Sequence, residues 1–321
     1  MGRSYRQILE SSPRALPTTM QKPVTSVDSL IKDFFNTKKV EKLIGAFKEY
    51  STIHQDGFIR ELYTVGKKTI QKEFPDWEYE LKFDLITITN ASLLEIMEAI
   101  EFPPTNTARF IKDATNIESK GANHFYGTDE DERFVIIEKA GKFYLKEKGP
   151  RNFFNYGIED ENLILKRREN KIETNPLEIA NTITQKYADG KTKNQGKLDK
   201  ERIDAHLLNT SNGRIYSLTV DNLVREDKKS LKQLEVEYSG IIPGFSASMN
   251  DEKTIVSDLT AIAKHITYFY QEVKLPNGKM LRLVPSQTTK YDFVRGQKSA
   301  EQSSLDSSVK TSERFEMLEI D

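Results

Sequence analysis

Apolar and charged residues alternate strictly along residues 76–85, which read DWEYELKFDL. Glu78, Glu80, Lys82 and Asp84 occupy every second position, and large apolar side chains fill the positions between them. A period of two predicts a β-strand with one polar and one apolar face. Such a strand usually turns its charges to water, so a row of three carboxylates and one ammonium beside a wide apolar row needs an explanation.

Strand-like runs dominate the chain from Pro75 to about residue 240. A turn at Ala140-Gly141 predicts a hairpin, and two helices interrupt the strands, one beginning at Asn90 and one near Asn175. Many strands with few helices predict an α+β fold: a closed antiparallel β-tunnel of about eight strands with flanking N- and C-terminal helices. The predicted strands are 77–88, 124–128, 133–139, 142–148, 162–169, 214–221 and 233–238.

The flanks of this region have a different character. The N-terminal flank begins with a polar, proline-containing stretch and continues with helical periodicity from Ser26. The C-terminal flank carries a helical pattern, then a hairpin that turns on Asn277-Gly278, then a run rich in Ser, Lys, Gln and Glu. We therefore expect a flexible arm (1–25), a helical extension (26–74), the tunnel domain (75–240), a C-terminal helix and hairpin (241–294) and a disordered tail (295–321).

Composition narrows the possible functions. The 321 residues include 48 basic and 49 acidic ones, for a net charge of −1, so no global field attracts nucleic acid or an anionic membrane. The absence of cysteine excludes disulfides, thiolate metal sites and a cysteine nucleophile. The sequence shows no apolar h-region of a signal peptide and no apolar run of about 18 residues, which predicts a cytoplasmic protein without a membrane partner.

Acidic and basic side chains are segregated by strand. The run QLEVEYSG repeats the alternation, with Glu235 and Glu237 on one face, whereas KFYLKEKGP places Lys146 and Lys148 together. Alternating charges on a single strand normally form a solvated face, but this segregation is unlike an ordinary mixed surface. If the charged faces point inward, the sheet forms a polar tunnel. Its carboxylates can hold hard divalent cations, and its basic side chains can hold a polyanion beside them.

This arrangement resembles the CYTH domain of the triphosphate tunnel metalloenzymes. Glu78-Tyr-Glu80-Leu-Lys82 matches the ExExK signature of that family, and further motifs agree in order over residues 75–240. HFYGT is similar to the tyrosine-rich strand, GKFYLKEKGP to the strand that ends in Lys-Gly-Pro, and KRRE to the Arg-x-Glu strand. YSLTVDNLV and LEVEYSG resemble the last two strands.

The resemblance implies a divalent-metal-dependent phosphohydrolase, in which glutamates hold Mg²⁺ or Mn²⁺ and basic residues clamp a triphosphate. The implied substrate is inorganic triphosphate or an organic triphosphate of the nucleoside or thiamine type. The expected catalytic residues are Glu78, Glu80 and Lys82. The expected metal ligands are Glu78, Glu80, Glu169, Asp221, Glu235 and Glu237, and the expected substrate-binding residues are Lys82, Lys146, Lys148, Arg167, Arg133 and Arg214.

Several positions depart from the family pattern. Val135 and Ile137 stand where the family carries arginines, and Arg133 shares their parity. Gly127 replaces an aspartate, and the strand expected before Asp221 reads DAHLLN, which offers no arginine. Fewer cations along the tunnel wall would neutralise a triphosphate less well, so we expect a different substrate or a site that binds without turnover.

Other functions use the same features. A class IV-type adenylate cyclase or an RNA 5′-triphosphatase would share the tunnel, although the basic patch that an RNA partner needs is not evident. The rival from another class is a non-catalytic protein that binds a nucleotide or polyphosphate. The four histidines show no metal spacing, with His206 the one worth testing, and we interpret the lysine-rich run GKTKNQGKLDK as a solvated loop. The sequence leaves the oligomeric state open.

Overall fold

The computed structural model describes residues 72–87, 91–102, 110–112, 117–155, 163–242, 251–270, 272–275, 278 and 280–296. The predicted N-terminal arm, nearly all of the helical extension and the tail beyond residue 296 lie outside the described residues. The predicted caps and turns at Asn90 and Asn277 also fall outside them.

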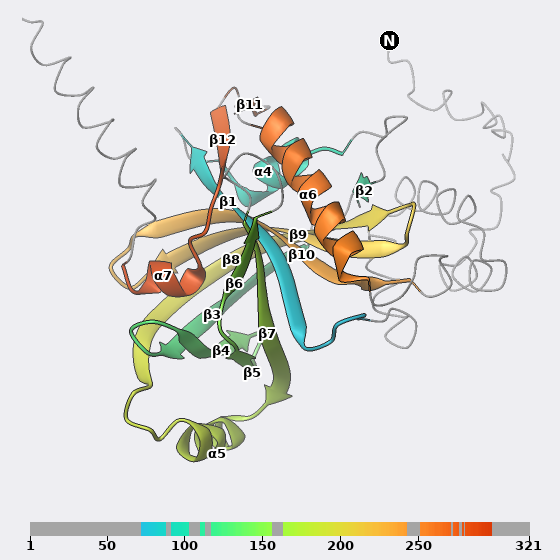
Figure 1. The fold of residues 1–321 in the computed structure, drawn as a ribbon. Coiled ribbons are helices and arrows are strands. Elements are labelled where there is room, and N and C mark those ends of the chain that lie inside the picture. Colours follow the sequence, from blue (N-terminus) through green and yellow to red (C-terminus); the bar gives the residue numbers. More distant parts are fainter. Residues whose placement is uncertain are drawn as a thin grey trace, which may run out of the picture.

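Eight antiparallel strands close into a barrel (Figure 1). Closure comes from β1, which pairs with β10 on one side and with β7 on the other. This confirms the predicted antiparallel tunnel of an α+β protein with flanking helices. In order around the barrel the strands are β1 (Trp77–Thr87), β10 (Ser230–Ile241), β9 (Arg214–Arg225), β8 (Lys193–Asn209), β3 (Ile117–Gly127), β4 (Glu132–Lys139), β5 (Lys142–Lys148) and β7 (Leu163–Thr174).

Short strands and helices decorate the barrel. β11 (Val273–Lys274) and β12 (Met280–Pro285) form the predicted hairpin, and β12 continues the sheet along the second half of β1. β6 (Asn152–Asn155) pairs with β7, and β2 (Phe110–Lys112) pairs with β8. The described helices are α4 (Leu93–Ala99), α5 (Pro176–Lys186), α6 (Glu252–Phe269) and α7 (Lys290–Val294).

The main hydrophobic core lies outside the barrel wall, beneath α4 and α6. The apolar row of β1, which includes Tyr79, Leu81 and Phe83, is buried in this core together with Leu259 and Ile262 of α6. Each large apolar side chain buried in this way contributes about 2 kcal/mol to folding. Because successive strand residues point to opposite faces, the charged row of β1 must then face the interior of the barrel. The helices that cover the outer face are therefore what turns the carboxylates inward.

Two local predictions are confirmed by backbone geometry. Ala140 and Gly141 have φ values of 50° and 73°, as the two-residue turn of a tight hairpin requires. Asn175 caps α5 through a hydrogen bond to the backbone N–H of Glu178. The helix predicted from Asn90 is α4, whose N-cap is Ser92 in a capping box with Glu95.

The largest error of the sequence analysis concerns β8. Residues 193–200 of the run that we interpreted as a solvated loop continue through DAHLLN as one strand of 17 residues. The first half of β8 shows no apolar row in the sequence because neither of its faces packs against the main hydrophobic core. Its outward face is in water, with the side chain of Asp199 67% exposed, while its inward face lines a polar cavity.

Among the described residues, no helix combines the length and the apolar character that a membrane crossing requires.

Candidate active site

The barrel encloses a cavity of about 140 Å³, room for several water molecules or a small polyanion. Charged side chains dominate its walls, and basic residues outnumber acidic ones. A buried site with this surplus of cations suits a ligand with several negative charges. The basic lining residues are Lys82, Lys120, Lys139, Lys146, Arg167, Lys171, Lys200, Arg202 and Lys290, and the acidic ones are Glu78, Glu80, Glu132, Glu235 and Glu237.

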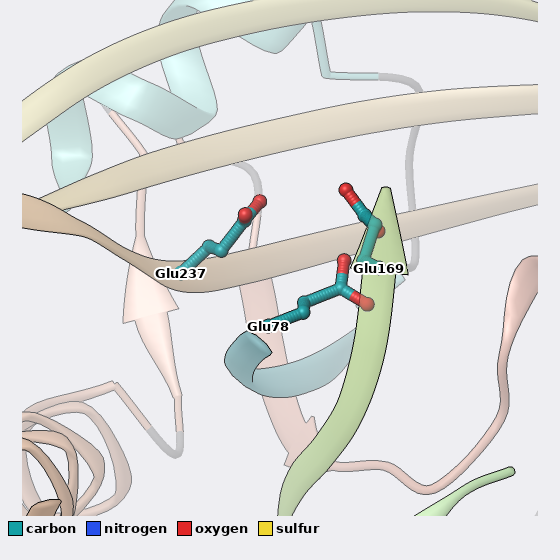
Figure 2. A group of neighbouring side chains, drawn as sticks. All are labelled: Glu78, Glu169 and Glu237. Atoms are coloured by element: carbon teal, nitrogen blue, oxygen red, sulfur yellow. The ribbon is translucent and has the colours of Figure 1, made fainter. Parts of the chain in front are cut away.

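Three carboxylates from neighbouring strands converge on one point (Figure 2). Glu78 of β1, Glu169 of β7 and Glu237 of β10 each place one oxygen within 4.8 Å of the others. Strand pairing explains the convergence, because β1 lies between β7 and β10 in the closed barrel. Three carboxylate oxygens form a hard donor set of the kind that Mg²⁺ and Mn²⁺ prefer. The donor chemistry of this cluster therefore fits the metal that the sequence predicted.

The three members of this cluster have different electrostatic environments. Burial, then the neighbouring charge of Glu78, raises the pKa of Glu237 to about 7. Burial also acts to raise the pKa of Glu78, but Arg167 and Lys148 outweigh it and hold that pKa well below its usual value. The cluster thus holds one carboxyl that resists ionisation because it is buried and because two other carboxylates are close. A divalent cation would relieve this repulsion and favour the ionised form of all three.

The raised pKa of Glu237 predicts an unusual pH dependence of stability. Its folded pKa of about 7 exceeds the ordinary value of 4.5, so folding favours the protonated form. The stabilisation from this group is complete below pH 4.5 and is lost as the pH rises through 7. In metal-free buffer, urea denaturation should show a smaller free energy of unfolding at pH 8 than at pH 5.5, and Glu237→Gln should reduce this difference. An unchanged pH difference in the variant would contradict this account of the cluster.

The predicted cations surround the cluster. The Lys146 and Lys148 ammonium groups lie 2.6 and 2.7 Å from Glu169 oxygens, and Lys148 also lies 3.3 Å from Glu78. Arg167 donates to Glu78 at 2.5 Å through Nε and to Glu132 at 2.7 Å through Nη1. These side chains already neutralise the carboxylates, which keeps a dense group of charges tolerable inside the barrel.

A second group of charges lies farther along β9 and β10. Arg202 makes a two-pronged contact with Asp221, with both donor–acceptor distances at 2.7 Å, and a contact of 3.2 Å with Glu235. Lys82 lies 2.8 Å from Glu235 and 2.9 Å from Glu80. Asp221, Glu235 and Glu80 were expected as metal ligands, but they lie outside the three-carboxylate cluster and are held by these cations.

Seven charged cavity residues are missing from the predicted site: Lys120, Glu132, Lys139, Lys171, Lys200, Arg202 and Lys290. Lys200 and Arg202 supply the cations that the sequence analysis found missing before Asp221, and their spacing of two residues was a usable signal. Burial, then the neighbouring charge of Arg202, holds the pKa of Lys200 well below its usual value. Lys290 arrives from α7, outside the strands in which the motifs were sought.

Arg133 does not line the cavity. The β3–β4 register shifts between Tyr126 and Gly127, so that Tyr126 pairs with Phe134 while Gly127 pairs with Glu132. This bulge skips Arg133, which is exposed, and points Glu132 into the cavity instead. The sequence analysis assumed a regular strand, in which alternate residues share a face, and therefore placed Arg133 on the wrong face.

Arg214 is also absent from the cavity lining. It is fully buried and makes a two-pronged ion pair with Glu73, at 2.9 and 2.8 Å, and Glu73 also accepts a hydrogen bond of 2.6 Å from Tyr238. Arg214 has the same parity on β9 as Tyr216, which lies in the outer core. Arg214 therefore stabilises the fold: it lies at the first residue of β9 and points away from the cavity.

Removing Arg214 should therefore affect stability and not the cavity. The Arg214→Met variant leaves the Glu73 carboxylate buried without this cation, and we expect the free energy of unfolding to fall by about 3–5 kcal/mol in urea denaturation. Below the unfolding transition, the affinity of the folded protein for Mn²⁺ should match that of the wild type. A loss of Mn²⁺ affinity without a loss of stability would contradict this assignment.

Comparisons with known proteins give a distant similarity only. No known protein family and no curated protein matches the sequence. Among solved structures, the Pct1 RNA triphosphatase of S. pombe is 11% identical, with 81% of this chain and 95% of that chain covered and a TM-score of 0.29. The same enzyme in complex with the Spt5 CTD is 11% identical, with 70% and 91% covered and a TM-score of 0.30. These TM-scores are too low to assign a function to this chain.

Proposed function

We propose that this protein is a divalent-metal-dependent triphosphatase, which hydrolyses the terminal phosphate of an inorganic or organic triphosphate inside the barrel. The observation that carries the proposal is that the cluster Glu78, Glu169 and Glu237 lies against Lys146, Lys148 and Arg167. Four of these six side chains, namely Glu78, Glu237, Lys146 and Arg167, line the enclosed cavity. Phosphoryl transfer depends on positioning and charge neutralisation more than on a covalent partner. A buried site with both charge types meets these needs.

The carboxylate cluster and the basic residues have separate roles in this proposal. Glu78, Glu169 and Glu237 would hold Mg²⁺ or Mn²⁺, which when bound neutralises phosphate oxygens and polarises the terminal phosphoryl group. Arg167 and Lys82 are buried cations from adjacent strands that we assign to the phosphate chain. Their fixed ion pairs hold them in place before substrate arrives, so little reorganisation is needed in the transition state.

Hydrolysis replaces one phosphorus–oxygen bond by another. The oxygen of water attacks the terminal phosphorus, and the bond from that phosphorus to the bridging oxygen breaks with its electron pair leaving on the bridging oxygen. We assign Glu80, which is buried, lines the cavity and lies outside the three-carboxylate cluster, to orient this water and accept its proton. The products are orthophosphate and the shortened phosphate chain.

The test separates the proposed activity from its alternatives by product. Purified protein is incubated with tripolyphosphate, ATP or RNA with a 5′-triphosphate, with Mg²⁺ or Mn²⁺, and orthophosphate, pyrophosphate and cyclic AMP are followed. We expect metal-dependent release of orthophosphate. Pyrophosphate together with cyclic AMP would favour a cyclase instead, and release from RNA alone would narrow the activity to an RNA 5′-triphosphatase. Ligand-induced thermal stabilisation without any product would favour a binding protein.

A further inference from the structure

Residues 286–296, which we call the end segment, cross one end of the barrel. There the inner face of the barrel turns from charged to apolar, and Tyr291 and Val294 of α7 pack against it. Tyr291 is only 1% exposed, so the helix inserts a side chain rather than resting on the rim. The inner-face residues that receive α7 are Phe125, Val135, Leu198, Leu223 and Leu231.

Hydrogen bonds attach the end segment to several strands and turns at this end of the barrel. Their partners lie in β1, in β10, in the β3–β4 turn, just before β6 and at the end of β9, all toward the same end of the antiparallel barrel. With this many hydrogen bonds, the end segment is held in place across one end of the barrel. The contacts are Ser286 N to Lys82 O at 2.9 Å, Gln233 Nε2 to Thr288 O at 2.8 Å, Tyr291 Oη to Thr128 O at 2.5 Å, Arg225 Nη1 to Phe293 O at 3.1 Å, and Arg151 Nη1 to Asp292 Oδ2 at 2.8 Å.

Two glycines of the barrel make room for α7. A Cβ at Gly127 would clash with the backbone oxygen of Asp131 in the β3–β4 turn and with the Tyr291 hydroxyl. A Cβ at Gly196, where φ is +124°, would lie 3.1 Å from Val294. Gly127 is the position at which the sequence departs from the aspartate of the family pattern. A glycine at this position thus fits both the tight β3–β4 turn and the end segment that packs against it.

The cavity runs from the end segment toward the opposite end of the barrel. Its lining includes Thr289 and Lys290 at the closed end, and Lys139 and Lys171, which are exposed, near the hairpin turn at the other end. Lys290 lies 2.8 Å from Asp221 and 2.5 Å from Glu235. An ammonium group has three hydrogens to donate, so two carboxylates leave one for an oxygen in the cavity.

We infer, building on the proposed function, that the end segment makes the cavity one-ended and that Lys290 binds the terminal phosphate of an entering triphosphate. A triphosphate enters past Lys139 and Lys171 with its free phosphate leading, and its organic group stays at the entrance. The substrate class is therefore a triphosphate with at least one unesterified end. A triphosphate esterified at both ends cannot bring a terminal phosphate to Lys290, because a bulky group would meet the end segment first.

Binding without turnover tests this inference. Isothermal titration calorimetry in metal-free buffer compares tripolyphosphate, a nucleoside 5′-triphosphate and a P1,P3-dinucleoside triphosphate on the wild type. The same titrations are repeated on Lys290→Met and on Lys229→Met, an exposed lysine beside the β9–β10 turn at the same end of the barrel. We expect the two free-ended ligands to bind at least 10-fold more tightly than the doubly esterified one. Lys290→Met should weaken tripolyphosphate binding by 10-fold or more, and Lys229→Met should leave it unchanged.

The outcomes separate this inference from the proposed function. Equal affinity for free-ended and doubly esterified ligands, or an undiminished affinity in Lys290→Met, overturns the one-ended cavity even if the protein hydrolyses triphosphates. Selective binding that depends on Lys290, in a protein that releases no product with Mg²⁺ or Mn²⁺, supports the inference while the proposed triphosphatase activity fails. Absence of triphosphate binding in the metal-free buffer overturns the inference, and absence of binding with Mn²⁺ added as well overturns both.

Discussion

The Glu78→Gln variant is expected to lose metal-dependent triphosphatase activity by about 10³-fold, the scale of a preorganised electrostatic group in an enclosed site. Glutamine keeps the size of the side chain but removes a charged oxygen donor from the cluster with Glu169 and Glu237. It also weakens the ion pairs that Glu78 makes with Lys148 and with Arg167, which we assign to the phosphate chain. The measurement is kcat/KM for orthophosphate release from tripolyphosphate with Mn²⁺.

The control for this variant is Glu138→Gln, an exposed carboxylate on β4 outside the cavity lining. It makes the same chemical change on the same barrel and should keep wild-type activity. Denaturation curves for both variants check that Glu78→Gln remains folded under assay conditions. If the folded Glu78→Gln protein were as active as Glu138→Gln, the proposed metal cluster would not be part of the reaction.

The Arg202→Gln variant is expected to lower kcat/KM by about 10²–10³-fold. Arg202 is held on the cavity wall by its two-pronged contact with Asp221 and by Glu235, so its charge is fixed in position before substrate arrives. Arg202→Lys should fall between the variant and the wild type, because lysine keeps the charge but not the planar fork. Steady-state kinetics of the three proteins give the comparison.

Arg168 provides the matched arginine for this experiment. It lies on β7 next to Arg167, is exposed, and is outside the cavity lining. Arg168→Gln should therefore keep nearly all of the activity. Equal losses in Arg168→Gln and Arg202→Gln would indicate a general effect of positive charge on the assay and would contradict a direct contact between Arg202 and the substrate.

The closed barrel was predictable because the sequences of its two acidic strands, β1 and β10, show both an apolar face and a charged face. On β1, a wide apolar row beside Glu78 and Glu80 identifies two unlike surfaces, and Leu234 and Val236 beside Glu235 repeat the pattern on β10. The same parity correctly placed Lys146 in the cavity. In each case the strand is regular, so alternation in the sequence maps directly onto the two faces of the wall.

Other features of the site could not be predicted from the alternation of apolar and charged residues. The bulge at the start of β4 exchanges the faces of Glu132 and Arg133, and nothing in ERFVIIEK marks the inserted residue. The first half of β8 lacks an apolar row because water and a polar cavity occupy its two sides. Lys290 comes from a five-residue helix after the barrel, and only the tertiary fold brings it to Asp221 and Glu235.

The most direct test of the central claim is an anomalous difference map from crystals of the full chain soaked in Mn²⁺, recorded at a wavelength where manganese scatters anomalously. The account predicts a peak between Glu78, Glu169 and Glu237, about 2.1 Å from a carboxylate oxygen of each, as for a hard six-coordinate cation. A Mn²⁺ peak elsewhere in the barrel with these three carboxylates unligated, or no peak in the barrel at saturating Mn²⁺, would contradict it.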